Sequence, residues 1–240
     1  MPRLDALVTK AGFAPSRERA QALILAGKVK VGGETVRKPD RAVPEGTPID
    51  VDSDQEYASR GALKLGPALA TFGIDVAGRV CADIGASTGG FTDVLLRRGA
   101  ARVYAIDVGR GLLHWRLRQD PRVVVIERVN ARNLESFPEP VSLVVIDVSF
   151  IGLEKVLPAI TAAAPGAEVV ALFKPQFQVE RGQVGKGGIV RDPEAVEAAL
   201  RRFRDWCAAS SLRVVGEAPS ALAGADGNRE IFIHLAATSR

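Results

Sequence analysis

A glycine-rich turn is the feature of this 240-residue sequence that is best suited to bind a small ligand. The segment DIGASTGGFT, residues 83–92, follows an apolar run typical of a strand and opens a stretch with helical periodicity. Glycines let a backbone approach a ligand closely, and the first amides of a helix have no partner within the helix. Asp107 ends the next apolar run, where a carboxylate can accept hydrogen bonds from ribose hydroxyls. The turn and Asp107 therefore predict a nucleoside-binding site.

The spacing within the turn favours one kind of cofactor over another. A dinucleotide fingerprint requires glycines in the order G-x-G-x-x-G, but Ser87 stands at the second glycine position. Asp83 precedes the first glycine, which suits a ligand with a cationic amino-acid end and no pyrophosphate. Adenosylmethionine fits that description. The alternatives are a nicotinamide cofactor and a glycine turn with a purely structural role.

Four further charged residues stand where they could meet beside this turn. Asp147 and Lys174 each end an apolar run, Glu230 opens the last run, and Lys64 lies in a helical stretch before the first run. Because ligands sit beyond the carboxyl ends of parallel strands, and an antiparallel strand begins at that same edge, we expect these side chains to converge. Each alone has an ordinary interpretation as a surface charge. Together they could align a hydroxyl, or accept its proton, for attack on a methyl group.

The elements that must position these residues alternate between strands and helices. Amphipathic stretches at 90–98, 153–164 and 192–209 lie between apolar runs. The runs cover residues 80–84, 102–107, 122–126, 141–147, 167–174, 212–218 and 230–235. This alternation predicts an α/β fold, with a Rossmann-like, mostly parallel sheet of seven strands and helices on both faces. The last two runs are joined by a loop too short for a crossover helix, so one strand should be antiparallel.

Residues 1–52 predict a separate small α+β domain. Helical periodicity follows Pro2 and then Ser16, a plausible N-cap, and an alternating segment turns at Gly32–Gly33 as a hairpin does. The polar stretch 53–57 is interpreted as a linker, and residues 58–240 as the α/β domain.

Positive charge is concentrated in this first domain. Residues 1–41 hold nine Lys and Arg against four Asp and Glu, an excess of five, whereas the net charge of the whole chain is +4. A basic module at one end is typical of a domain that contacts nucleic-acid phosphates. The alternative is a solvated surface that is basic without a partner.

Composition argues against several other classes of protein. No apolar run approaches the eighteen residues of a membrane-spanning helix, and the first residues lack the apolar region of a secretory signal. Cys81 and Cys207 lie in apolar, element-like stretches, so we expect no disulfide and a cytoplasmic location. His114 and His234 stand far apart with no ligand spacing around them, so we expect no metal.

The sequence resembles the TlyA family, the haemolysin-A-type ribosomal RNA 2′-O-methyltransferases, whose catalytic domain is FtsJ-like. The resemblance spans essentially the whole chain. It is carried by the motifs SRGALKL, DIGASTGGFTDVLL, DPRVVVIERVNAR, VIDVSFI, FKPQF, GQVGKGGIVRDP and GNREIFIHL. Residues 3–33 are similar to the RNA-binding domain named for ribosomal small-subunit protein four. Two positions depart from the family pattern: Arg110 replaces an aromatic residue, and Gln178 replaces an acidic one.

The resemblance implies an enzyme that transfers a methyl group from adenosylmethionine to a ribose 2′-hydroxyl of rRNA, with cytidine as the nucleotide. Adenosylhomocysteine would be the second product, no metal would take part, and the partner would be rRNA or a ribosomal subunit. The family's catalytic tetrad falls on Lys64, Asp147, Lys174 and Glu230. Its cofactor contacts fall on Asp83, Gly85, Ala86, Ser87, Thr88, Gly89, Gly90, Asp107, Val108, Asn130, Ala131 and Asp147. We expect RNA contacts from Arg3, Lys10, Arg17, Arg19, Lys28, Lys30 and Lys38.

The role of the tetrad lysines has two interpretations. Lys174 is our first candidate to deprotonate or orient the hydroxyl, with Asp147 and Glu230 holding Lys174 and Lys64. Neighbouring carboxylates favour a protonated lysine, so positioning is the firmer expectation. Other functions are also considered: a membrane-damaging protein, as the haemolysin name implies, a non-catalytic RNA-binding factor, and a nicotinamide enzyme. The sequence selects neither the rRNA, nor the position of the methylated cytidine within it, nor the oligomeric state.

Overall fold

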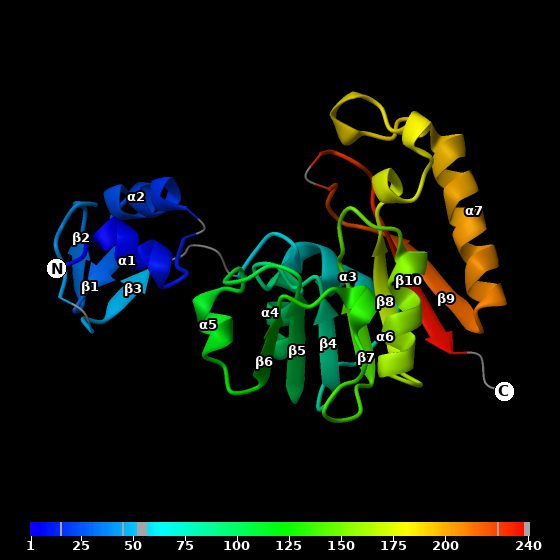
Figure 1. Cartoon of the computed structure of the whole chain (residues 1–240), viewed down its shortest axis with the longest axis horizontal. Helices are drawn as coiled ribbons and strands as arrows, with labels where there is room; N and C mark the ends of the chain where they lie inside the picture. Colours follow the sequence, from blue (N-terminus) through cyan, green and yellow to red (C-terminus); the bar gives the residue numbers. More distant parts are fainter. Residues whose placement is uncertain (15, 45, 52–56, 225, 238–240) are drawn as a thin grey trace.

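The structure is a computed structural model that describes residues 1–14, 16–44, 46–51, 57–224 and 226–237 (Figure 1). Of the expected linker, residues 53–57, only Tyr57 falls within the described residues. A small α+β unit at the N-terminus is followed by a larger α/β unit with a single mostly parallel sheet.

The N-terminal unit packs two helices against a three-stranded antiparallel sheet. Its elements are α1 (Leu4–Lys10), α2 (Arg17–Leu25), β1 (Val29–Val31), β2 (Glu34–Val36) and β3 (Ile49–Val51), with strand order β2-β1-β3. The Ser16 side chain accepts a hydrogen bond from the Arg19 amide at 3.2 Å and caps α2. Gly32 and Gly33 both have positive φ, as a two-residue hairpin turn requires. The predicted cap and hairpin are therefore confirmed.

The larger unit contains a seven-stranded sheet in the order β6-β5-β4-β7-β8-β10-β9. Its strands are β4 (Val80–Ile84), β5 (Arg102–Asp107), β6 (Val123–Glu127), β7 (Leu143–Ile146), β8 (Glu168–Phe173), β9 (Leu212–Pro219) and β10 (Ile231–Ala237). Strand β10 runs antiparallel to both of its neighbours, and the other pairs are parallel. The α/β fold class and the single antiparallel strand are confirmed. The strand order reverses between β4 and β7, which is where doubly wound sheets bind ligands.

Helices cover both faces of this sheet. They are α3 (Ala62–Thr71), α4 (Gly90–Arg97), α5 (Trp115–Arg118), α6 (Leu157–Ala163) and α7 (Pro193–Ala209). Single 3-10 turns lie at η1 (Ala131–Asn133), η2 (Leu153–Lys155), η3 (Pro175–Phe177), η4 (Arg181–Gln183) and η5 (Lys186–Gly188). The stretch predicted at 153–164 is therefore a 3-10 turn followed by a helix. Pro158 explains the late start of α6, because proline is tolerated in the first turn of a helix but not in its interior.

The two faces of the sheet form two separate cores. On one face, strand residues such as Ile84 and Ile146 pack against apolar side chains of α6 and α7. On the other, Cys81 and Val145 pack against α3, α4 and α5. Successive strand residues therefore alternate between the two cores, as the two-residue period of a strand requires. Both faces of the sheet are therefore covered.

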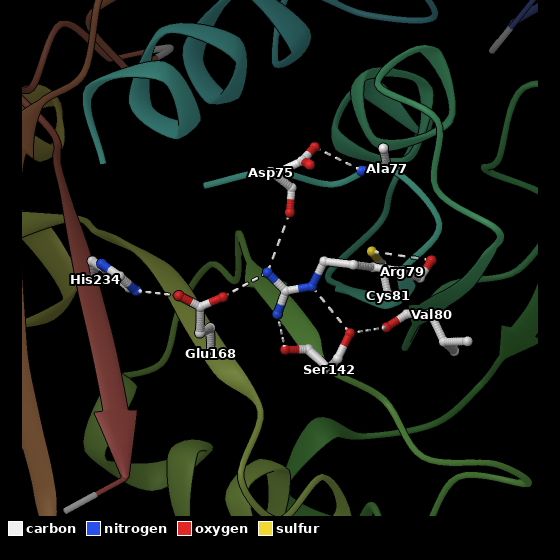
Figure 2. A network of polar contacts seen from close by, with 8 residues as sticks. All are labelled: Asp75, Ala77, Arg79, Val80, Cys81, Ser142, Glu168 and His234. Atoms are coloured by element: carbon white, nitrogen blue, oxygen red, sulfur yellow. Dashed lines mark hydrogen bonds and ion pairs between the residues drawn. The ribbon is translucent and has the colours of Figure 1, made fainter. Parts of the chain in front are cut away.

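At the amino-terminal edge of the sheet, Arg79 joins the starts of three strands (Figure 2). Its guanidinium donates to the Ser142 hydroxyl at 3.0 Å and to Glu168 Oε2 at 2.5 Å, and it also donates to the carbonyl oxygens of Ser142 and Asp75. His234 Nε2 of β10 lies 3.3 Å from Glu168 Oε1 without hydrogen-bond geometry. This network joins the strands at the amino-terminal edge of the sheet, which is opposite the edge where the parallel strands end.

Candidate functional site

A cavity of about 660 Å³ opens at the carboxyl ends of β4 and β7. Residues 59–61 and 222–224 and Phe91 form part of its wall. The predicted residues that line it are Lys64, Asp83, Gly85, Ala86, Ser87, Thr88, Gly90 and Asp147. The structure thus brings the glycine turn and two members of the tetrad to one hollow, and its volume is in the range of small-molecule sites.

The turn has little room for side chains where it crosses the neighbouring strand. Gly85 has φ of +82°, and a Cβ there would lie 2.5 Å from the Asp147 carbonyl oxygen. Gly89 has φ of +94°, and a Cβ there would collide with Leu117. Glycine is therefore required at both positions for conformation and for space. The result is a backbone that stays close to the cavity.

Asp83 lies beneath the turn with one carboxylate oxygen unpaired. Its Oδ2 accepts hydrogen bonds from the Thr92 amide at 2.8 Å and the Thr92 hydroxyl at 2.7 Å, and so satisfies an amide in the first turn of α4. Its Oδ1 is buried and has no partner among the described residues. Burial, with a smaller contribution from the nearby Asp147 and Asp107, raises the pKa of Asp83 to about 7. A buried, unpartnered carboxylate oxygen fits a cationic amino group.

Asp107 contacts the turn through backbone hydrogen bonds. Its Oδ2 accepts from the Ser87 amide at 2.8 Å, and its Oδ1 accepts from the Gly109 amide at 2.7 Å. Each oxygen keeps a further lone pair for a hydroxyl donor. Asp107 lies outside the lining of the cavity, so the structure gives it a role in fixing the turn that the sequence did not predict.

The remaining predicted cofactor contacts follow Asp107 and β6. The Val129 amide donates to the Asp107 carbonyl oxygen at 3.2 Å, which places residues 129–131 beside Asp107. The Asn130 side chain caps η1 by accepting from the Arg132 amide at 3.1 Å. Val108, Asn130 and Ala131 do not line the cavity with residues 83–90, and Val108 is largely exposed.

The four predicted tetrad residues form two ion pairs. Lys64 Nζ lies 2.6 Å from Glu230 Oε2, and Lys174 Nζ lies 2.5 Å from Asp147 Oδ1. The second contact is close but lacks hydrogen-bond geometry, and Lys174 instead donates to the Ser149 hydroxyl at 3.0 Å. Lys174 and Glu230 are buried, and each reaches the cavity through the partner that lines it. One ion pair therefore joins α3 to the start of β10, and the other joins the ends of β7 and β8.

Sequence reasoning did not identify several residues that shape this site. Thr92 satisfies Asp83, and Ser149 accepts from Lys174. Both residues belong to motifs that the sequence analysis identified, and their hydroxyl groups could have indicated that they hydrogen-bond within the site. The His114 amide donates to the Thr88 carbonyl oxygen at 3.1 Å, which fixes the segment before α5 against the turn. On α5, the Trp115 ring lies 4.7 Å from the Phe13 ring of the N-terminal unit.

The predicted RNA contacts divide into two groups. Arg3 and Arg17 lie 2.9 and 3.1 Å from Asp5 Oδ2, and the Arg3 hydrogen bond holds the pKa of that buried carboxyl well below its usual range. These two arginines therefore stabilise the fold of the N-terminal unit, whatever else they bind. Lys10, Arg19 and Lys38 are exposed, and Lys28 and Lys30 are half-buried.

Of the two departures from the family pattern, one lies on the surface and the other contacts neighbouring residues away from the tetrad. Arg110 is exposed in the loop after β5. Gln178 accepts from Arg202 at its backbone carbonyl, and its side-chain amide fits when it donates to Glu154 at 3.0 Å and accepts from the Leu153 amide at 3.1 Å. Neither contact involves the tetrad.

Two further observations concern metals and membranes. Within the described ranges, no three His, Cys, Asp or Glu side chains are grouped as metal ligands would be. No helix in the part of the chain that the structure describes combines the length and apolar character needed to span a bilayer.

A mostly parallel seven-stranded sheet, with a glycine turn after β4 and a carboxylate after β5, defines a Rossmann-like methyltransferase. Residues 57–237 match the family described as FtsJ-like methyltransferase, and residues 2–49 match the S4 domain. A relative from Mycobacterium tuberculosis, named 16S/23S rRNA (cytidine-2′-O)-methyltransferase TlyA, is 51% identical over 97% of this chain and 89% of its own length. The chain belongs to the TlyA group of the FtsJ-like methyltransferase family.

Other relatives carry a haemolysin name. Hemolysin A of Brachyspira hyodysenteriae is 43% identical over 97% of this chain and 99% of its own. A solved structure from Streptococcus thermophilus, also named as a hemolysin, is 42% identical, with a TM-score of 0.74 over 99% of this chain and 88% of that one. Relatives of both names therefore align with nearly the whole of this chain.

Proposed function

We propose that this enzyme transfers a methyl group from adenosylmethionine to the ribose 2′-hydroxyl of a cytidine in rRNA. The observation that carries the proposal is the pairing of Lys174 with Asp147, and of Lys64 with Glu230, at the cavity formed by the glycine turn. The relative that is 51% identical is named for cytidine-2′-O methylation of 16S and 23S rRNA, which supports the same substrate here.

The chemistry of the cavity fits adenosylmethionine. Asp83 offers a buried carboxylate oxygen without a partner, which suits the cationic amino group of the methionine part. Asp107, with a free lone pair on each oxygen, would hold the ribose hydroxyls, with Val108, Asn130 and Ala131 beside it. Gly85 and Gly90 would bring the backbone close to the methionine part. The bound cofactor supplies an activated methyl group, so the residues described need only bind and orient the reactants.

The tetrad would act on the acceptor hydroxyl. Lys174, fixed between Asp147 and Ser149, is placed to orient the 2′-oxygen or to take its proton. Lys64, held by Glu230, would place a second cationic group on the same side of the cavity. Asp147 and Glu230 hold these lysines in one position before the substrate arrives, and that positioning is their main contribution.

The S4 domain would supply the sequence-independent part of RNA binding. We propose residues 1–52 as this domain and residues 58–240 as the catalytic domain, with exposed basic residues such as Lys10, Arg19 and Lys38 on phosphates. The partner would be rRNA or a ribosomal subunit in the cytoplasm, and no membrane would take part. The alternative of a membrane-damaging protein rests on the haemolysin name of some relatives.

The test is methyl transfer by Lys174→Ala to rRNA from cells that lack the enzyme. General acid–base assistance is typically worth about 10²–10⁴-fold, so the methyl-transfer rate should fall at least about 100-fold. Binding of adenosylmethionine should be retained. Lys155→Ala, a change at an exposed lysine in η2, is the matched control and should leave the rate unchanged. A Lys174→Ala enzyme that methylates rRNA at the wild-type rate would remove the tetrad from the mechanism.

A further inference from the structure

A second cavity, of about 670 Å³, is lined by the candidate catalytic residue Glu230. It shares no lining residue with the cavity of the glycine turn. Its walls come from the amino-terminal part of α7, the end of β9, the start of β10 and residues 190–192 (Figure 1). The proposed mechanism assigns no ligand to this space, although it lies directly beside the Lys64–Glu230 pair.

The floor of this second cavity is apolar. Val196 and Leu200 of α7 face it together with Pro175 and Ile231. The face of a nucleobase can pack against such an aliphatic surface, and the apolar area that leaves water favours binding. The volume is within the range in which proteins bind ligands of nucleotide size.

The rim of this cavity carries two exposed arginines. Arg191 and Arg229 line the cavity and are exposed. Neither has an ion-pair or hydrogen-bond partner among the residues that the structure describes. A guanidinium group binds phosphate oxygens through a planar fork of donors, so this rim is suited to a phosphate.

Two of the three carboxylates of the same cavity are already in ion pairs. Asp192 accepts a hydrogen bond from the Glu194 amide at 2.9 Å as the cap of α7, and Glu230 is bound to Lys64. Glu197 lies 2.8 Å from Arg204. Asp192 is not neutralised by its backbone hydrogen bond, so two arginines and one carboxylate remain without an ionic partner among the described residues, and this balance favours an anion.

The wall that carries Arg191 is fixed before any ligand binds. The buried Asn228 side chain accepts from the Val190 amide at 2.9 Å and donates to the Gly188 carbonyl oxygen at 2.8 Å. These two hydrogen bonds join residues 188–190 to the loop before β10. A site that is already formed loses less conformational entropy when its ligand binds.

We propose that this cavity is a subsite for a nucleotide that flanks the methylated one on the RNA strand. The base packs on the apolar floor, and Arg191 and Arg229 hold the adjacent phosphate. The subsite rests on the proposed rRNA methyltransferase function and deepens it, because it fixes how the RNA strand runs past Glu230. The S4 domain then supplies general affinity, and the subsite sets the register of the target ribose.

The first test compares Arg191→Ala/Arg229→Ala with wild type in methylation of rRNA. The apparent KM for RNA should rise about tenfold or more, and the salt dependence of binding should weaken, because each phosphate contact contributes about 0.7 to the slope for a single strand. Affinity for adenosylmethionine should not change. Arg213→Ala is the matched control, since Arg213 is an exposed arginine of β9 six residues, or about 20 Å, from Pro219 of the cavity.

The second test removes the base instead of the protein group. Once the methylated cytidine is mapped, oligoribonucleotides with an abasic site at each neighbouring position are compared on wild type and on Val196→Trp, which fills the cavity. An abasic site at one neighbouring position should lower kcat/KM of wild type about tenfold, with little further loss in Val196→Trp. Losses that multiply, or that are equal at every position, would overturn the subsite.

These outcomes separate the subsite from the function on which it rests. A wild-type enzyme that methylates no rRNA contradicts the proposed function. A wild-type enzyme that methylates rRNA, with an Arg191→Ala/Arg229→Ala variant that keeps the same KM and salt slope, contradicts only the subsite. Because both arginines are exposed, these variants should fold, and thermal unfolding measures whether Val196→Trp does so too.

Discussion

Lys64 and Glu230 are 166 residues apart in sequence, yet Lys64 Nζ lies 2.6 Å from Glu230 Oε2. Both side chains are largely buried, with 14% and 3% of their surface exposed. The first helix of the catalytic domain and its last strand are thus joined by one ion pair at the site. Breaking a buried pair by removing one partner leaves an unpaired charge, whereas removing both can be nearly neutral.

This pair can be tested for stability and activity separately. Glu230→Ala should destabilise the protein by about 3–5 kcal/mol, the usual cost of an unpaired buried charge. The double variant Lys64→Met/Glu230→Leu should regain most of that stability in urea unfolding, but not the methyl-transfer rate. If Glu230 only positions Lys64, Glu230→Ala should lower the rate less than Lys174→Ala does. A double variant that recovered activity with stability would show that the pair is structural.

Asp83 makes cofactor binding dependent on pH. Because the pKa of Asp83 is raised to about 7 and the cationic amino group requires the carboxylate, affinity for adenosylmethionine should fall as pH decreases below 7. The loss approaches tenfold per pH unit, and affinity should fall again in the alkaline range, where the amino group of the ligand loses its proton. Calorimetry between pH 5.5 and about 8.5 measures this profile.

The same residue acts on stability in the free protein. Its folded pKa is above the ordinary value of 3.8, so the neutral form is favoured on folding and that contribution is lost as pH rises from about 4 towards 7. Asp83→Asn cannot ionise and can still accept from Thr92. It should flatten both the binding and the stability profiles, and a variant that kept the wild-type profiles would assign them to another group.

The strands of the sheet and the position of the site could be predicted from the sequence, whereas the side-chain contacts within the site could be predicted only in part. Strands β4 and β5 were predicted to the residue, because their ends are marked by Asp83-Ile84-Gly85 and by Asp107. Convergence of the tetrad at one edge followed from the parallel order of the strands. That the two carboxylates hold the two lysines was also expected, whereas the geometry of each contact was not, since it depends on how side chains and a helix pack on the sheet rather than on a pattern along the chain.

Side chains that bind the backbone or each other within a domain were the least predictable. Arg3 and Arg17 were assigned to RNA by charge alone, although they bind the buried Asp5. Asp107 was assigned to ribose, although both of its oxygens accept amides. In each case the type of residue allowed two partners, and the sequence contained no signal for the nearer one.

Asp107 therefore contributes to cofactor binding in two ways. Asp107→Ala removes the acceptors for ribose and also releases the Ser87 amide, so adenosylmethionine should bind about 1.5–3 kcal/mol more weakly by calorimetry. Asp75→Ala, which removes an exposed carboxylate at the opposite edge of the sheet, is the control. Unchanged binding by Asp107→Ala would remove Asp107 from the ribose role.

The exposed basic residues of the S4 domain should govern the salt dependence of RNA binding. Deleting residues 1–52 should weaken rRNA binding and flatten its dependence on salt, while adenosylmethionine binding persists. Within the domain, Lys10→Ala/Arg19→Ala should reproduce part of that loss without a change in unfolding temperature. If Lys10→Ala/Arg19→Ala kept the wild-type salt slope, RNA would bind elsewhere on the chain.

Arg3→Ala should act on the stability of the domain, because it removes the main partner of the Asp5 carboxylate. Since the pKa of Asp5 is lowered in the folded state, its contribution to stability is present above pH 4 and is lost as pH falls below that value. Arg3→Ala and Asp5→Asn should both lower domain stability at pH 7 and weaken its decline in acid, as measured by circular dichroism of the isolated segment and the full chain.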